Sequence, residues 1–129
     1  MTPLEAARRW ARGWEAAWRE HDVAAVAELY AGGASFHSHP FRDPQDPATY
    51  AAWAFESEEA GAEVQFGDAF ASAGDRSVVE WHAVVVEKDG GETTLAGVSL
   101  LRFDGDGLVV EQRDYWAQAS GRREPFARL

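Results

Sequence analysis

The pattern of apolar residues changes from helical to extended near residue 60, and this change constrains the fold more than any other feature of the sequence. Four long segments rich in β-branched and aromatic residues follow, separated by GD, DGG and DGDG: EVQFGDAFASA, RSVVEWHAVVVEK, ETTLAGVSLLRFD and GLVVEQRDYWAQ. Connections of this kind are typical of hairpins, so the segments predict an antiparallel meander. Strands this long must twist and curve, and the hollow side of the sheet needs a cover.

The beginning of the chain predicts a helix that could provide this cover. The residues TPLE place Thr2 and Glu5 as a capping box, with Pro3 in the first helical position. Apolar residues then recur at helical spacing to about residue 20, which gives the helix one apolar face. Members of this face include Leu4, Ala7, Trp10, Ala11, Trp14, Ala17 and Trp18.

Two shorter helices and a strand are expected between this helix and the sheet. Asp22 can cap a helix over VAAVAELYA that ends at two glycines, and a short strand should cover residues 34–39. Asp46 can cap a third helix from Pro47 to about Ala60. The chain is therefore expected to be a single α+β domain over residues 1–129, with a cone-shaped curved antiparallel sheet wrapped around three N-terminal helices.

Composition excludes several classes of function. The 129 residues carry a formal net charge of −10, and such an acidic surface repels nucleic acid and anionic membranes. The chain has no cysteine, no long apolar run and no N-terminal stretch typical of a signal peptide. We therefore expect a cytoplasmic protein with neither nucleic-acid nor membrane partners.

Two stretches resemble the nuclear transport factor 2-like superfamily, in particular its SnoaL-like and ketosteroid isomerase-like branches. They are WEAAWREHDVAAVAELYAGGASFHSHP near the start and LAGVSLLRFDGDGLVVEQRDYW near the end, and the order of elements between them also fits. The resemblance covers nearly the whole chain. It implies the cone-shaped fold, a pocket for a small apolar molecule and a homodimer, but it does not imply one activity, because the fold hosts isomerases, cyclases, hydrolases and binding proteins.

The catalytic positions of ketosteroid isomerases hold other residues in this chain. Their aspartate base precedes a proline, where this chain has His39 before Pro40. Their oxyanion-hole tyrosine corresponds to Trp14, and their protonated aspartate corresponds to Ser99 in SLLRF. The usual steroid isomerisation is therefore not expected.

Between Tyr30 and Pro40 the chain has one residue more than those isomerases, which implies a bulge and leaves the direction of the two histidines open. Either His37 and His39 both face the pocket, or only His39 reaches it. Placing Ser99 inward, as the resemblance suggests, predicts which residues of the last three strands face the pocket. They are Glu80, His82, Val84, Val86, Gly97, Ser99, Leu101, Phe103, Gln112, Asp114 and Trp116.

These residues suggest general acid–base chemistry on a small, apolar, cyclic substrate without a cofactor. His39 or Asp114 would remove a proton beside a carbonyl or activate water, and His82 would return a proton or hold the oxyanion. An apolar cone would raise the pKa of Asp114. The residues expected to contact the substrate are Trp14, Trp18, Phe41, Trp53, Glu80, Ser99, Leu101, Gln112 and Trp116.

Two other interpretations remain open. Two histidines and a carboxylate could hold iron or zinc, although H-x-H is a weak signal and no metal site is predicted. A non-catalytic module could instead bind a hydrophobic ligand or a second copy. Four apolar residues expected on the outer sheet face favour association with a second copy of the chain: Val79, Trp81, Val85 and Tyr115.

Overall fold

The first helix, α1 (Pro3–Glu20), begins and ends as its sequence predicts. In the computed structural model, which describes residues 1–58, 60–127 and 129, the Thr2 hydroxyl accepts a hydrogen bond from the backbone N–H of Glu5. The Glu5 carboxylate accepts one from the backbone N–H of Thr2. His21 ends the helix in the left-handed conformation. The buried face of α1 consists of Ala6, Ala7, Trp10, Ala11, Trp14 and Ala17.

The other helices are shorter than expected. Helix α2 spans Val23–Ala27, and the chain enters a strand before the two glycines that were expected to end the helix. Helix α3 (Pro47–Trp53) starts at its predicted cap, where Asp46 accepts a hydrogen bond from the Thr49 N–H. The chain then continues as a π-helix, η1 (Ala54–Glu58), a rare form that often occurs at functional sites.

The strands form one curved sheet in the described part of the chain, in the order β1-β5-β4-β3-β2. The four hairpin-connected strands are antiparallel as predicted. The first strand differs, because β1 pairs in parallel with β5 at one edge. The predicted α+β cone is confirmed. The strand bounds are Tyr30–His37 for β1, Gly61–Ala73 for β2, Arg76–Val86 for β3, Glu92–Phe103 for β4 and Val109–Ser120 for β5.

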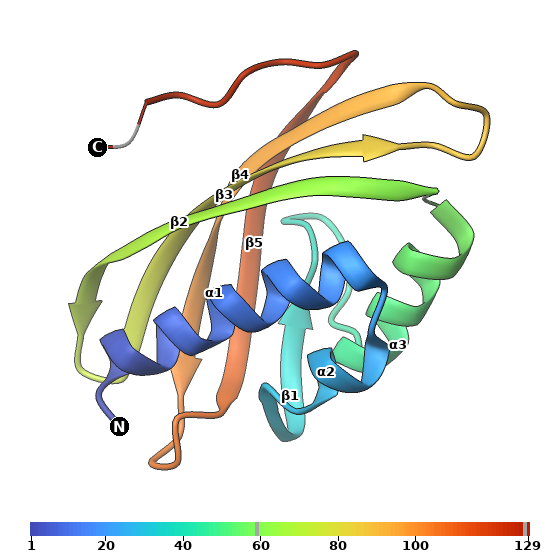
Figure 1. The fold of residues 1–129 in the computed structure, drawn as a ribbon. Coiled ribbons are helices and arrows are strands. Elements are labelled where there is room, and N and C mark those ends of the chain that lie inside the picture. Colours follow the sequence, from blue (N-terminus) through green and yellow to red (C-terminus); the bar gives the residue numbers. More distant parts are fainter. Residues whose placement is uncertain (59, 128) are drawn as a thin grey trace.

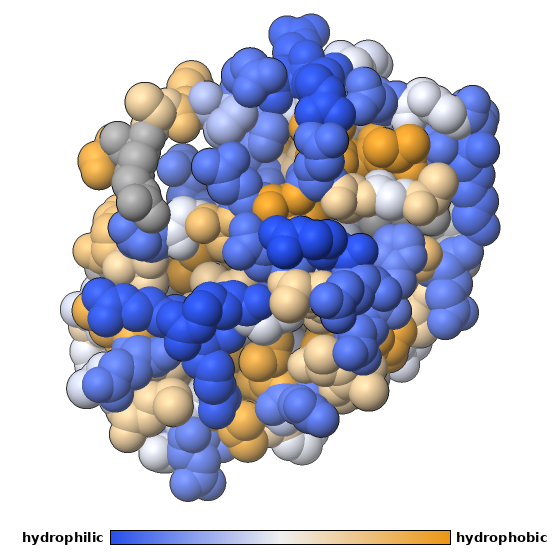
Figure 2. Space-filling view, viewed as in Figure 1, coloured by the Kyte–Doolittle hydropathy of each residue, from blue (hydrophilic) through white to orange (hydrophobic). Residues whose placement is uncertain are grey.

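The sheet curves around α1, which crosses its concave side, while α2 and α3 lie near β1 (Figure 1). The buried core lies between α1 and this concave side. Hydrophilic residues run across the middle of the helical face, where α1 lies (Figure 2). After β5 the chain returns along the sheet, and Arg122 forms ion pairs with Glu63 and Glu92. Arg122 therefore connects the C-terminal segment to acidic residues of the sheet.

The orientation predicted for β3 is wrong by one residue. Ser99 of β4 lies opposite Val79, and Gly97 lies opposite Trp81, so the odd-numbered residues of β3 share the inner face. The cause is the connection 88–90, which has three residues and ends with Gly90 at a φ of 89°. The predicted orientation requires an even number of residues here, and a shift of one residue moves every side chain to the opposite face.

This correction changes the outer face on which the homodimer prediction relied. Val79, Trp81 and Val85 are buried on the inner side, so three of the four residues proposed for the contact do not face outward. Tyr115 is exposed on the outer face, together with Leu100. The homodimer stays a prediction. Within the described chain, no helix combines the length and the apolar character that a membrane span requires.

Candidate functional site

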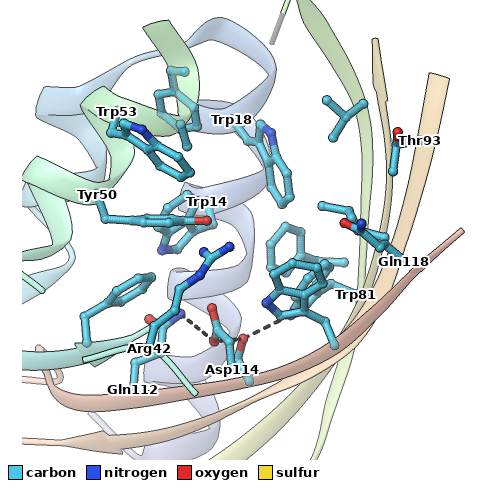
Figure 3. A pocket seen from close by; sticks show the side chains of 18 of the residues that line it. Trp14, Trp18, Arg42, Tyr50, Trp53, Trp81, Thr93, Gln112, Asp114 and Gln118 are labelled. Carbon is cyan, nitrogen blue, oxygen red and sulfur yellow. Dashed lines mark hydrogen bonds between the residues drawn. The ribbon is translucent and has the colours of Figure 1, made fainter. Parts of the chain in front are cut away.

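A cavity of about 180 Å³ lies between the helices and the concave side of the sheet (Figure 3). Ten aromatic rings form much of its wall: α1 and α3 together provide five of them, and β1, η1, β2, β3 and β5 provide one each. An apolar cavity of about 150 Å³ holds benzene, so this space suits a molecule with one ring. The rings in the lining are those of Trp10, Trp14, Trp18, Phe36, Tyr50, Trp53, Phe55, Phe66, Trp81 and Trp116.

Asp114 is the carboxyl group at the base of this cavity, and its residue is only 9% exposed. Its Oδ1 accepts two hydrogen bonds, one from the Ser99 hydroxyl at 2.6 Å and one from the Gln112 Nε2 at 2.9 Å. The indole of Trp81 in turn donates to the Ser99 oxygen at 3.0 Å. Both donors address Oδ1, which leaves Oδ2 to face the cavity (Figure 3).

A second layer of hydrogen bonds fixes Gln112 behind Asp114. The Tyr30 hydroxyl donates to Gln112 Oε1, and the Trp14 indole donates to the Tyr30 oxygen at 2.7 Å. The Trp10 indole lies 3.2 Å from both acceptors. Because Gln112 Oε1 is occupied as an acceptor, its amide nitrogen must face Asp114. The network therefore determines that Gln112 donates a hydrogen bond to the Asp114 carboxyl group.

Burial raises the pKa of Asp114 from 3.8 to about 6, because the charged form loses its hydration. The hydrogen bonds from Ser99 and Gln112 oppose this rise without cancelling it. Burial also raises the pKa of Tyr30, which therefore stays protonated as a donor. Asp114 can thus be a carboxylate at neutral pH and accept a proton more readily than a solvated aspartate.

Arg42 is the cation among the described residues that line the cavity. Its guanidinium lies over the rings of Trp53 and Trp116, at 5.9 and 5.6 Å from their centroids. One of its nitrogens donates to the Ser38 hydroxyl at 3.1 Å. The Trp116 indole donates to the backbone oxygen of Ser38, so the ring beneath Arg42 is itself fixed.

The structure brings seven of the predicted site residues to the cavity wall. Leu101 also points inward but is buried in the core, away from the lining. The seven include the full predicted set from β5, which shows that the orientation of β4 and β5 was predicted correctly. They are Trp14, Trp18, Trp53, Ser99, Gln112, Asp114 and Trp116.

Four predicted site residues lie elsewhere, and their predicted position in the pocket is wrong. Glu80 and His82 fall on the outer side of β3, where His82 Nε2 lies 2.9 Å from the backbone oxygen of Arg123. Phe41 is 92% exposed. His39 is half-buried against the edge of the Trp116 ring and does not line the cavity.

The direction of the two histidines follows from the irregular pairing of β1. Its register with β5 shifts between Tyr30 and Ser35, so β1 is irregular within the segment where the additional residue was expected. Beyond the shift Phe36 and Ser38 are buried, so His37 and His39 alternate to the other side. Within the described residues, no three histidine, aspartate or glutamate side chains gather closely enough to hold a metal ion.

Thirteen of the twenty lining residues lay outside the predicted site, and three of them bear most on its chemistry: Trp81, Tyr50 and Arg42. Trp81 would have been found by recognising a three-residue connection after β3, for which a glycine in the last position is the typical signal. Tyr50 belongs to the inner face of the expected third helix, beside Trp53. Arg42 lies in a loop, and no periodicity predicts where a loop side chain points.

Replacing Ser99 with Ala is expected to raise the pKa of Asp114 above its value of about 6. The lost hydroxyl stabilises the charged carboxylate, so its removal favours the protonated form. The carboxyl ¹³C chemical shift of Asp114, followed against pH by NMR, measures this change. Ser120→Ala, at the exposed end of β5, is the control. A midpoint that is unchanged or lower in Ser99→Ala contradicts the assigned hydrogen bond.

Comparison with known proteins bears on the family of this chain. The SnoaL-like domain family matches residues 11–112. No curated protein sequence matches the chain. Three similar solved structures share the fold at low sequence identity. The first is SalBIII, an epoxide hydrolase/cyclase-like enzyme with a role in pyran ring formation in the polyether salinomycin; it is 16% identical, the match covers 89% of this chain and 90% of that chain, and the TM-score is 0.72. The second is a Δ5-3-ketosteroid isomerase from Mycobacterium sp., with 16% identity, coverage of 93% of this chain and 99% of that chain, and a TM-score of 0.72. The third is an LEH-like epoxide hydrolase from M. tuberculosis, with 15% identity, coverage of 89% of this chain and 82% of that chain, and a TM-score of 0.66.

At these identities the structures establish the fold alone, which is the nuclear transport factor 2-like cone. The family match is stronger evidence, because it covers most of the sequence. The chain belongs to the SnoaL-like domain family.

Proposed function

We propose that the protein is a cofactor-independent enzyme in which Asp114 is the general base for a small cyclic substrate. The observation that carries this proposal is the asymmetric environment of one buried carboxyl group. Oδ1 accepts two hydrogen bonds, and Oδ2 faces an apolar cavity. A structural carboxylate would normally have both oxygens paired, because an unpaired buried charge is costly.

The raised pKa supports the same role. A base with a pKa of about 6 is charged at neutral pH and still has appreciable affinity for a proton. Asp114 would take a proton from a carbon beside a carbonyl group, and the electron pair of that C–H bond would move toward the carbonyl oxygen. The carboxylic acid so formed would then return the proton to another carbon of the same molecule.

This cycle uses one group as both base and acid, and the lining of the cavity favours it over hydrolysis. Among the described lining residues, the carboxyl groups are those of Asp114 and Glu87, and no histidine is present. Glu87 is exposed at the rim, where it accepts a hydrogen bond from Thr93. Hydrolysis of an epoxide needs an acid for the ring oxygen as well as a base for water, whereas an isomerisation needs only the single shuttle. We therefore propose an isomerase or cyclase activity.

The proposal is tested by hydrogen exchange at carbon. Cyclic ketones of one ring, dissolved in D₂O with the protein, should exchange protons beside the carbonyl faster than without it, as followed by NMR. Asp114→Asn is expected to reduce this acceleration by about 10²- to 10⁴-fold, the usual contribution of a general base. Asp43→Asn, which changes an exposed aspartate outside the cavity, should keep it. Equal rates for Asp114→Asn and the unchanged protein would exclude Asp114 as the base.

A further inference from the structure

We infer that Arg42 binds a carboxylate of the ligand, so that the substrate is a one-ring carboxylic acid rather than a neutral apolar molecule. This inference rests on the proposed function for the placement of the reacting carbon near Asp114. Arg42 and Asp114 belong to the same cavity wall, and their side chains extend into the same space (Figure 3). One bound molecule can therefore contact both.

The first argument is that Arg42 lacks a counter-ion. Among the residues that the structure describes, no carboxylate forms an ion pair with its guanidinium. Its polar contact is the neutral hydroxyl of Ser38, and one guanidinium has more N–H donors than this contact uses. Arg42 therefore brings to the wall of an apolar cavity N–H donors that an anionic ligand could use.

The second argument is the rigidity of the guanidinium. Two indole rings and the Ser38 hydroxyl hold it in place, and Trp116 is itself anchored on the Ser38 backbone. A planar guanidinium held in this way can present two parallel N–H groups to a carboxylate, and such pairs are stronger than neutral hydrogen bonds. Because these donors are already positioned, less conformational entropy is lost when a ligand binds.

The third argument is the position of Arg42 in the cavity. The residue as a whole is exposed, so the charge that it binds stays near water at the mouth. A permanent carboxylate suits this place, because its complete dehydration would be costly. A charge that develops only during the reaction would instead need its donors deeper, beside Asp114. Glu87 lies at the rim beside Thr93, which Figure 3 places across the cavity from Trp53. The negative charge of Glu87 repels the carboxylate of the ligand, which therefore binds on the Arg42 side.

The size of the cavity sets the remainder of the ligand. About 180 Å³ accommodates one six-membered ring among the tryptophans. With its carboxylate at Arg42, the ring would lie between the indoles and reach toward Asp114 Oδ2. The expected ligand is thus a monocyclic acid whose ring carries the carbon from which Asp114 takes the proton.

Calorimetric titration with benzoate and with benzamide tests the inference, because the two probes have nearly the same shape and differ in charge. The unchanged protein should bind benzoate about tenfold or more tightly than benzamide at about pH 7, as expected for a charged hydrogen-bonded pair. Arg42→Gln should remove this preference by weakening benzoate alone, and Arg42→Lys should keep part of it. Arg8→Gln removes the same charge from an exposed position outside the cavity and should keep all of it.

A preference for benzoate that survives in Arg42→Gln, or the absence of any preference in the unchanged protein, overturns the inference. Loss of turnover in Arg42→Gln with the preference intact also overturns it, since Arg42 would then act on a developing charge. Asp114→Asn separates this inference from the proposed function. The Asp114→Asn protein should still prefer benzoate to benzamide. If it also exchanged substrate protons at the normal rate, the role of Asp114 as general base would be refuted, and the role of Arg42 would be unaffected.

Discussion

Replacing Asp114 with Asn is expected to stabilise the protein by up to about 3 kcal/mol at neutral pH. Burial raises the pKa of this carboxyl from 3.8 to about 6, and this rise corresponds to about 3 kcal/mol of unfavourable interaction with the charged form. The Asn side-chain oxygen can still accept the hydrogen bonds from Ser99 and Gln112. The substitution therefore removes the buried charge and keeps its supporting contacts.

The pH dependence identifies the origin of the effect. Between about pH 4 and pH 6 the folded protein binds more protons at Asp114 than the unfolded chain does, so this residue lowers stability as the pH rises. Below that range the carboxyl is neutral in both states, and the advantage of Asp114→Asn should disappear. Urea unfolding of both proteins at about pH 3 and pH 8 measures the difference. The exposed control Asp43→Asn should show no such pH-dependent gain, and parallel pH profiles for Asp114→Asn and the unchanged protein would contradict the prediction.

If Asp114→Asn gained stability and lost activity, this result would indicate that Asp114 has a functional role. A carboxyl that destabilises the fold and can be replaced by its neutral isostere contributes little to structure. A purely structural pair of Asp114 with His82 would predict the opposite result, since breaking a buried pair is destabilising. The structure already excludes that pair, because His82 lies on the outer side of the sheet.

The parts of the fold that depend on local sequence could be predicted. The capping box of α1 and its apolar spacing involve residues only three or four positions apart. The long extended segments predicted the sheet for a similar reason, because β-branched residues and hairpin glycines act locally. The inner faces of β4 and β5 then followed from one correctly oriented serine, Ser99.

The failures on β1 and β3 come from shifts in strand register. One additional residue in the connection after β3 exchanged Trp81 for Glu80 and His82 on the inner face. The bulge in β1 likewise directed His39 away from the cavity. Neither shift changes the composition of the strand itself, and the signal for the shift in β3 lies in the connection that follows it. Arg42 lies over the rings of Trp53 and Trp116, and Trp116 is distant from it in sequence.

Gly97→Ala is expected to destabilise the protein by about 3 kcal/mol or more. Gly97 lies in β4, between Trp81 of β3 and Trp116 of β5. A Cβ atom at this position would lie 2.3 Å from the backbone oxygen of Tyr115 and 2.5 Å from the Cβ of Trp116. Backbone atoms on a paired strand cannot move aside as a flexible side chain can, so β4 and β5 would have to separate, and overpacking of this kind costs 1–3 kcal/mol or more.

Gly32→Ala provides the matched control, because no atom lies within 4 Å of a Cβ built at Gly32 and its backbone conformation suits alanine. That substitution should change the free energy of unfolding by less than about 1 kcal/mol, in either direction. Urea unfolding of both variants measures the contrast, and similar midpoints would show that β4 and β5 can adjust. The effect should extend to the cavity, since displacement of Trp116 moves the ring that supports Arg42. Gly97→Ala protein that remains folded should therefore also bind benzoate more weakly, which would connect the close approach of two strands to recognition of the ligand.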